Sequence, residues 1–227
     1  MSTSEPSLPP SPLKAVAFDL DGLLVNSEDV YENVGAEVLS RRGKRFEDDL
    51  RHAMMGRPAA AALQVMIDWH GLDDSIEALT LESEQVFWET ARNGLACMPG
   101  AAELLDWMDE RQVRRGLVTS GGRQYAERIL EAFGIKDRFL FRITADDVHN
   151  GKPHPEPYLQ AAERLGVSPA EMLVLEDSGA GSRAGVAAGA YTVAVPNRHT
   201  QGHDFAGVAY IASSLNDAHI RRVLGGG

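Results

Sequence analysis

Residues 14–28 constrain the fold more than any other part of the chain, because they join a short apolar run to two closely spaced carboxylates. The run Ala-Val-Ala-Phe at 15–18 is typical of a strand buried in a parallel sheet. Asp19 ends this strand, Asp21 follows, and Gly22 lets the backbone turn. Two carboxylates so close together raise one another's pKa unless a cation lies between them. The pattern favours Mg²⁺, with an ordinary strand-to-turn exit as the alternative.

The net charge and the cysteine content limit the binding partners and the cellular location that we expect. The formal net charge of −11 argues against nucleic acid or an anionic membrane as the main partner. A protein this acidic that handles phosphates must concentrate positive charge locally. Cys97 is the only cysteine, which excludes an intrachain disulfide and favours a cytoplasmic location.

The first twelve residues carry four Ser, four Pro and no basic residue. This composition predicts a disordered tail over 1–12 and lacks the features of a signal peptide. No apolar run approaches the roughly 20 residues that a membrane-spanning helix needs. No feature of the sequence calls for an obligate protein partner.

An all-helical block follows the first strand. Apolar residues recur at helical spacing in 46–54, 58–69 and 74–92, and Ser27 is a candidate cap for a preceding helix that reaches about Arg42. No strand-like alternation interrupts this block. We therefore expect a helical cap domain over 27–94, placed as a lid because it leaves the chain directly after the aspartate pair.

After Pro99, helical segments alternate with short apolar strands. Helices are expected at 100–111, 122–133, 156–165 and 180–188 and from about Leu215, with strands at 115–119, 139–144, 171–176, 191–195 and 208–211. This rhythm predicts an α/β fold, a Rossmann-like doubly wound parallel sheet. Its core domain would comprise 13–26 and 95–227, interrupted by the helical cap.

Suggestive residues lie where the expected strands end, which is where such sheets bind ligands. Thr119, Ser120 and Gly121 precede a helix and could cradle an anion, although a simple helix cap is the alternative. Glu176 and Asp177 add two carboxylates at another strand end.

The alternatives at these later positions are plain structural roles. Asp177 or Ser178 could cap the next helix, but capping does not explain a carboxylate such as Glu176 at a buried strand end without a positive partner. Lys152 stands in a loop framed by three prolines, which argues that it is held in place and not merely solvated. Together these groups suggest a phosphoryl-transfer site.

Four motifs, Asp19-Leu-Asp21-Gly, Thr119-Ser120, Lys152 and Glu176-Asp177, resemble those of the haloacid dehalogenase superfamily. Their order and spacing are similar to its phosphatase and sugar-phosphomutase branch with a helical cap, and the resemblance covers about 13–197. It implies that Asp19 attacks phosphorus, that Asp21 is the general acid and base, and that Thr119, Ser120 and Lys152 hold the phosphoryl oxygens.

The resemblance also implies a metal site. Mg²⁺ would bind the carboxylate of Asp19, the backbone carbonyl of Asp21 and Asp177, with Glu176 as a further ligand or as a partner of the ligands. Met55-Gly56-Arg57-Pro58 looks like the cap loop that approaches the site in relatives, so Arg57 is a candidate substrate contact, with a solvated arginine as the alternative.

The sequence departs from this branch in one informative place. Its phosphomutases carry a His four residues beyond a Ser or Thr after the first motif, whereas Tyr31 follows Ser27 at that spacing here. The dehalogenases of the superfamily lack the second aspartate of the first motif, which is present here as Asp21. We therefore expect a Mg²⁺-dependent phosphatase of a small phosphorylated metabolite, such as a sugar phosphate. The alternatives are a sugar-phosphate mutase and a non-catalytic protein that binds a phosphorylated metabolite.

Overall fold

The computed structural model describes residues 8–9, 11–54, 57 and 59–225. The chain divides into two compact units. The first comprises Met1–Val25 and Cys97–Gly227, and the second comprises Asn26–Ala96. No helix among the described residues combines the length and the apolar character needed to cross a membrane.

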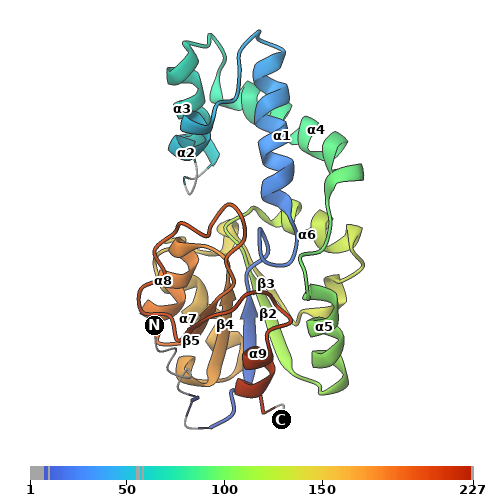
Figure 1. The fold of residues 1–227 in the computed structure, drawn as a ribbon, viewed down its shortest axis with the longest axis vertical. Coiled ribbons are helices and arrows are strands. Elements are labelled where there is room, and N and C mark those ends of the chain that lie inside the picture. The colour runs from blue at the N-terminus through green and yellow to red at the C-terminus, as the bar shows by residue number, and fades with distance from the viewer. Residues whose placement is uncertain (1–7, 10, 55–56, 58, 226–227) are drawn as a thin grey trace. The chain divides into compact units, whose positions relative to one another are not determined.

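The first unit is built on a parallel sheet. Within the described residues it has six strands in the order β3-β2-β1-β4-β5-β6 (Figure 1). The strands are β1 (Ala15–Phe18), β2 (Arg114–Val118), β3 (Arg142–Ile143), β4 (Met172–Glu176), β5 (Tyr191–Ala194) and β6 (Tyr210–Ile211). The predicted α/β class with a doubly wound parallel sheet is thereby confirmed.

Helices connect these strands and surround the sheet (Figure 1). They are α5 (Ala101–Glu110), α6 (Arg123–Ala132), α7 (Glu156–Leu165), α8 (Gly179–Ala187) and α9 (Ala218–Val223), with short 3-10 turns at Lys136–Arg138, Ala145–Asp147 and Pro169–Glu171. Because both faces of the sheet are covered, the central strands β1 and β4 are buried along their whole length and need apolar residues at nearly every position.

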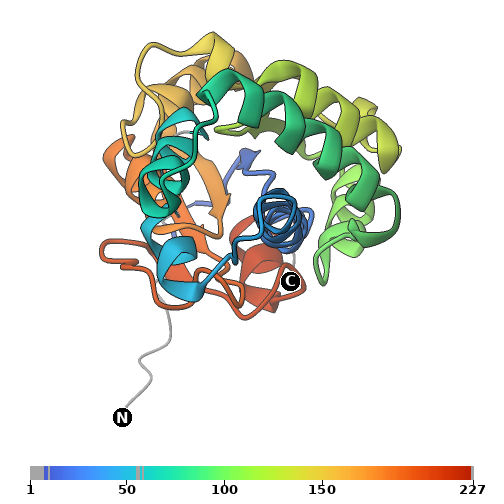
Figure 2. The ribbon, with the colours of Figure 1, turned by 90° about the horizontal axis from the view of Figure 1, so that it is seen from above.

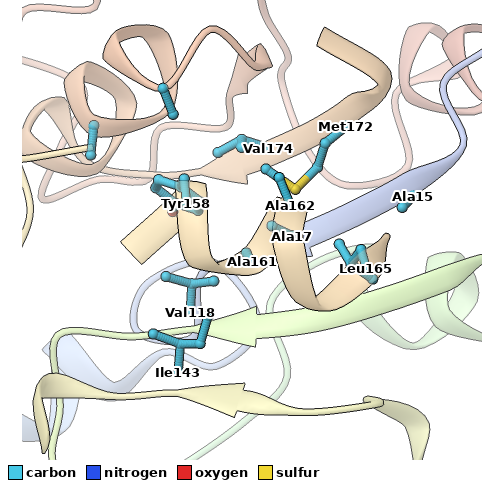
Figure 3. Close-up of a cluster of buried hydrophobic side chains, with 12 residues drawn as sticks. Ala15, Ala17, Val118, Ile143, Tyr158, Ala161, Ala162, Leu165, Met172 and Val174 are labelled. Carbon is cyan, nitrogen blue, oxygen red and sulfur yellow. The ribbon is translucent and has the colours of Figure 1, made fainter. Parts of the chain in front are cut away.

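One part of the core lies between α7 and the sheet (Figure 3). The side chains of Tyr158, Ala161 and Leu165 from α7 pack against residues of the strands, among them Ala17 and Val118. The small alanines of β1 and α7 let the helix approach the sheet closely. This packing fixes α7, which begins four residues after Lys152.

The second unit is entirely helical over its described residues. It contains α1 (Ser27–Ser40), α2 (Asp48–Met54), α3 (Ala59–His70) and α4 (Ile76–Gly94). Figure 2 views α1 almost end-on. Arg42, just beyond α1, pairs with Asp74 at 2.7 Å and with Glu82 of α4 at 2.6 Å, which ties the end of α1 to α4.

Several expected boundaries need correction. Asn26, not Ser27, is the residue before the first helix, and the side chain of Asn26 makes no capping hydrogen bond. The strand expected at 139–144 is reduced to Arg142–Ile143, because a 3-10 turn ends at Arg138 and the ring of Phe139 turns inward to meet Phe18 edge-on. The expected strand at 208–211 likewise keeps only Tyr210–Ile211.

Some expectations concern residues that the structure does not describe. Most of the tail expected over 1–12 lies outside the described residues, as do Met55, Gly56 and Pro58 of the expected cap loop.

Candidate active site

Three neighbouring strand ends form the floor of the candidate site. β1 pairs with β2 on one side and with β4 on the other, and Phe18 is in register with Leu117 and Leu175. The next residue, Asp19, donates its backbone N–H to the carbonyl of Leu175 at 3.0 Å. The sequence-predicted groups at the ends of these three strands therefore meet at one edge of the sheet.

Lys152 joins these strand ends. Its ammonium group donates to Asp19 Oδ1 at 2.5 Å, to Glu176 Oε1 at 2.6 Å and to the carbonyl of Val118 at 2.9 Å. The Lys152 side chain is only 5% exposed, so the alternative of a solvated loop lysine is wrong. A single cation thus holds the ends of β1, β2 and β4.

Burial and charge shift the pKa values of this pair. Burial alone would lower the pKa of Lys152, but the carboxylates of Asp19 and Glu176 outweigh it and raise that pKa. Burial raises the pKa of Asp19 well above its usual value, and repulsion from Glu176 and Asp21 adds to it, while Lys152 opposes the rise. The single ammonium group of Lys152 therefore offsets only part of the rise in the pKa of Asp19.

Glu176 is fully buried, and polar groups meet both of its carboxylate oxygens. Besides Lys152, the hydroxyl of Tyr158 donates to Oε1 at 2.7 Å. The hydroxyl of Ser178 donates to Oε2 at 3.0 Å, and its backbone N–H does so at 3.3 Å. Ser178 also caps α8 by accepting from the backbone N–H of Gly181, so the capping alternative is correct for that residue.

Asp177 is held by a hydrogen bond from a residue that follows β5. Its Oδ2 accepts a hydrogen bond from the side-chain amide of Asn197 at 2.9 Å, and the same amide donates to the carbonyl of Gly22 at 3.0 Å. Gly22 has a φ of 76°, and a Cβ there would lie 2.4 Å from Asp177 Oδ2. Only glycine allows the turn after the aspartate pair to pass this close to Asp177.

These residues fit a divalent cation. Asp19, Glu176 and Asp177 are all buried, and one carboxylate oxygen from each lies within 4.8 Å of the others. Three buried carboxylates around one ammonium group leave an excess of negative charge, which is costly without a further cation. A hard cation that prefers oxygen ligands, such as Mg²⁺, matches this set.

The aspartate that follows β1 and the residues that follow β2 are linked directly. The hydroxyl of Thr119 donates to Asp21 Oδ2 at 3.1 Å and accepts from the backbone N–H of Gly121 at 3.0 Å. Gly122 is the residue before α6, and the carboxylate of Asp146, not Thr119 or Ser120, accepts from the first backbone N–H of that helix, at Arg123, at 2.8 Å. The helix-cap alternative for Thr119 is therefore wrong, while Ser120 is exposed beside it.

Arg57 belongs to the helical unit. It is exposed, and its Nε donates to the carbonyl of Ala53 at 2.7 Å. Its contact with a substrate stays a prediction.

Sequence reasoning missed Tyr125, Tyr158 and Asn197, which touch the site carboxylates, and it considered Ser178 only as a helix cap. Asn197 follows the end of β5, so the rule that polar residues gather at strand ends could have found it. Tyr158 and Tyr125 lie within α7 and α6, where a single aromatic residue looks like any core position.

Comparison with known proteins agrees with this geometry. The model of the haloacid dehalogenase-like hydrolases matches residues 13–189. The chain belongs to this family. The family membership expected from the four motifs is confirmed.

Relatives of this haloacid dehalogenase-like hydrolase include two phosphatases. It is 35% identical to validoxylamine A 7'-phosphate phosphatase of Streptomyces hygroscopicus subsp. limoneus over 82% of this chain and 87% of the relative. It is 32% identical to the phosphorylated carbohydrates phosphatase of Thermotoga maritima over 78% of this chain and 82% of the relative.

A solved structure points to the same branch of the hydrolase family. The crystal structure of a putative beta-phosphoglucomutase from Thermotoga maritima superposes with a TM-score of 0.79 and 28% identity. The match covers 94% of this hydrolase and 97% of that chain. The expected phosphatase and phosphomutase branch with a helical cap is thus the branch to which the chain is similar.

Proposed function

We propose that this hydrolase is a Mg²⁺-dependent phosphatase that cleaves a small phosphorylated metabolite through an aspartyl-phosphate intermediate. The observation that carries the proposal is the buried Lys152, which donates to both Asp19 and Glu176 at the edge of the sheet. Such a group beside a carboxylate is suited to an anionic ester, because it offsets the repulsion between carboxylate and phosphoryl oxygens.

In the first step, a carboxylate oxygen of Asp19 attacks phosphorus. A bond between that oxygen and phosphorus forms, and the bond from phosphorus to the ester oxygen breaks. Asp21 gives its proton to the departing oxygen, which leaves as an alcohol. Thr119, the backbone N–H of Ser120 and Lys152 are the groups we assign to the phosphoryl oxygens.

In the second step, Asp21 acts as a base. It takes a proton from a water molecule, which attacks phosphorus and breaks the bond to Asp19. Inorganic phosphate and the Asp19 carboxylate result, and Asp21 is protonated again for the next cycle. The single turn that follows β1 thus supplies both the nucleophile and the proton carrier.

Asp19, Asp177 and the backbone carbonyl of Asp21 are the groups that would hold Mg²⁺. When bound, the ion supplies the positive charge that keeps Asp19 ionised and screens it from the phosphoryl oxygens. A carboxylate offers about four lone-pair sites, and Glu176 receives contacts from Lys152, Tyr158 and two groups of Ser178. These contacts indicate that Glu176 holds Lys152 in place and does not bind the ion directly.

The names of the relatives support a substrate class. One is named as a phosphatase of phosphorylated carbohydrates, and others are named as a hexitol phosphatase and a phosphoglycolate phosphatase. We therefore propose a sugar phosphate or a related polyol or glycolate phosphate as the substrate.

A sugar-phosphate mutase is the second candidate, favoured by the similarity to a putative beta-phosphoglucomutase. The residue four positions after Ser27 is Tyr31, which is 47% exposed. The phosphomutases carry a histidine at this position. Because this chain has a tyrosine instead, we prefer the phosphatase. A non-catalytic binding protein is the weakest candidate, because it would not need Asp19, Asp21 and Lys152 together.

The decisive experiment measures phosphate release from a panel of phosphorylated sugars, polyols, nucleotides and glycolate, with a mutase assay primed by a sugar bisphosphate alongside. We expect release that EDTA abolishes, that Mg²⁺ restores, and that Asp19→Asn lacks. Isomerised sugar phosphate without release would favour the mutase. Binding of the esters without either reaction would favour the binding protein, and release that persists without metal would contradict the metal site.

A further inference from the structure

The proposed proton carrier, Asp21, is held by a tyrosine outside the four motifs. The hydroxyl of Tyr125, on α6, donates to Asp21 Oδ1 at 2.5 Å. The other oxygen, Oδ2, accepts from Thr119 at 3.1 Å. Both oxygens of Asp21 are therefore contacted by the segment that runs from the end of β2 into α6.

The local backbone makes the reach of Tyr125 possible. Tyr125 is the third residue of α6 and is half-buried. A Cβ at Gly121 would lie 2.8 Å from Cδ1 of the Tyr125 ring and 3.3 Å from Cε1. Any side chain at Gly121 would therefore displace the ring, so this glycine leaves room for Tyr125 to cross to Asp21.

The two contacts of Asp21 differ in what they allow during a proton transfer. A protonated carboxyl group keeps one oxygen that only accepts, and it carries the proton on the other. The Tyr125 hydroxyl can donate to Oδ1 whether or not Oδ2 carries the proton. The Thr119 hydroxyl cannot keep donating in the same way to a protonated Oδ2, and it is also one of the groups assigned to the phosphoryl oxygens.

We propose that Tyr125 is a positioning residue for Asp21, acting through its hydroxyl. It holds the carboxyl plane through both halves of the proton cycle and keeps Oδ2 directed at the leaving oxygen and later at the water. This inference rests on the proposed phosphatase function. It assigns Tyr125 a task in leaving-group protonation and none in the neutralisation of the phosphoryl group.

Esters that differ in their need for a proton separate these tasks. An alkyl phosphate must release an alkoxide, which leaves only when it is protonated, whereas 4-nitrophenyl phosphate releases a stable phenolate. The experiment compares kcat/KM for the best alkyl phosphate of the panel with kcat/KM for 4-nitrophenyl phosphate, in wild type and in Tyr125→Phe. kcat/KM is the right quantity because it reports the steps up to departure of the leaving group.

We expect Tyr125→Phe to lower kcat/KM for the alkyl ester about 10-fold more than for the aryl ester, a fraction of the roughly 10² to 10⁴ that general acid catalysis contributes. The ratio of the two values, measured on one preparation, is independent of how much of the variant is correctly folded. A loss of folded protein therefore cannot imitate the result.

Tyr158→Phe is the matched control, because it removes a hydroxyl that contacts Glu176 and not Asp21. It should lower both values by the same factor. An unchanged ratio in Tyr125→Phe would overturn the inference while the phosphatase stands. A wild type that releases phosphate from neither ester would remove the proposed function and this inference with it.

Discussion

Replacing the proposed nucleophile should stabilise the metal-free protein while it abolishes turnover. Asp19 is 6% exposed, and its pKa is raised well above the usual value by burial, with repulsion from Glu176 and Asp21. A group whose folded pKa is raised favours the folded state only below its unfolded pKa, near pH 4, and this benefit is lost as the pH rises through the folded pKa. At neutral pH, and without a metal ion, the Asp19 carboxylate therefore costs stability.

The size of the effect follows from what Asp19→Asn keeps and removes. The amide oxygen can still accept from Lys152, which also retains Glu176 at 2.6 Å. A neutral acceptor in place of a charged one loses about 1 kcal/mol. Desolvation of a buried carboxylate costs several kcal/mol, so we expect Asp19→Asn to raise the free energy of unfolding by about 1 to 2 kcal/mol in EDTA.

Urea unfolding in EDTA and in Mg²⁺ measures this change. Wild type should gain about 2.7 kcal/mol when Mg²⁺ is at 100 times its Kd, whereas Asp19→Asn should gain much less, so the order of stability reverses. Asp137→Asn is the control of equal charge change, because Asp137 is exposed, and it should stay within about 0.5 kcal/mol of wild type in both buffers. An Asp19→Asn variant that is less stable than wild type in EDTA would refute the reasoning.

Three further outcomes test other parts of the structure. Lys152→Met should lower the rate of phosphate release, measured by steady-state kinetics, by about 10²-fold or more. It should also lower the free energy of unfolding, measured in urea, by about 3 to 5 kcal/mol, because it leaves buried carboxylates unpaired. A rate near that of wild type would remove Lys152 from the mechanism. Tyr158→Phe should cost about 1 to 3 kcal/mol of stability, because the hydroxyl that donates to Glu176 at 2.7 Å is lost, and a change below about 0.5 kcal/mol would show that this bond contributes little. Burial lowers the pKa of His219, so stability present above about pH 6.5 should be lost as the pH falls through the lowered pKa; urea unfolding at pH 7.5 and 5.5 should show a smaller pH dependence in His219→Gln, and an equal one would contradict the assignment.

The sequence determined the parts of this protein that depend on local pattern. A buried parallel strand needs an unbroken apolar run, so 15–18 and 171–176 were recognisable without their neighbours. Ligand groups in such a sheet gather at the carboxyl ends of the strands, so Asp19 and Glu176 could be named before their contacts were known. The prolines around Lys152 indicated that this loop residue is held in place. The helical block could be recognised as well, because amphipathic spacing is a local property.

Helix and strand ends were less accessible. The expected strand at 139–144 includes apolar residues that are favourable for a strand, yet the Phe139 ring packs against Phe18 and only Arg142–Ile143 joins the sheet. The first helix begins after Asn26, although Ser27 has the chemistry of a cap. At Phe139 a contact with a residue distant in sequence outweighed the local preference for a strand. At Ser27 the path of the chain outweighed the local preference for a helix cap.

Only the tertiary structure decided how the polar groups divide their hydrogen bonds. The motifs predicted that Lys152, Glu176 and Thr119 would stand at the site, but not that Lys152 would bridge two carboxylates or that Thr119 would donate to Asp21. Tyr158 and Tyr125 reach Glu176 and Asp21 from helices whose positions are set by packing against the sheet and by the space above Gly121. Hydrogen bonds act over about 3 Å between residues far apart in the chain, so they depend on a geometry that sequence spacing alone does not contain.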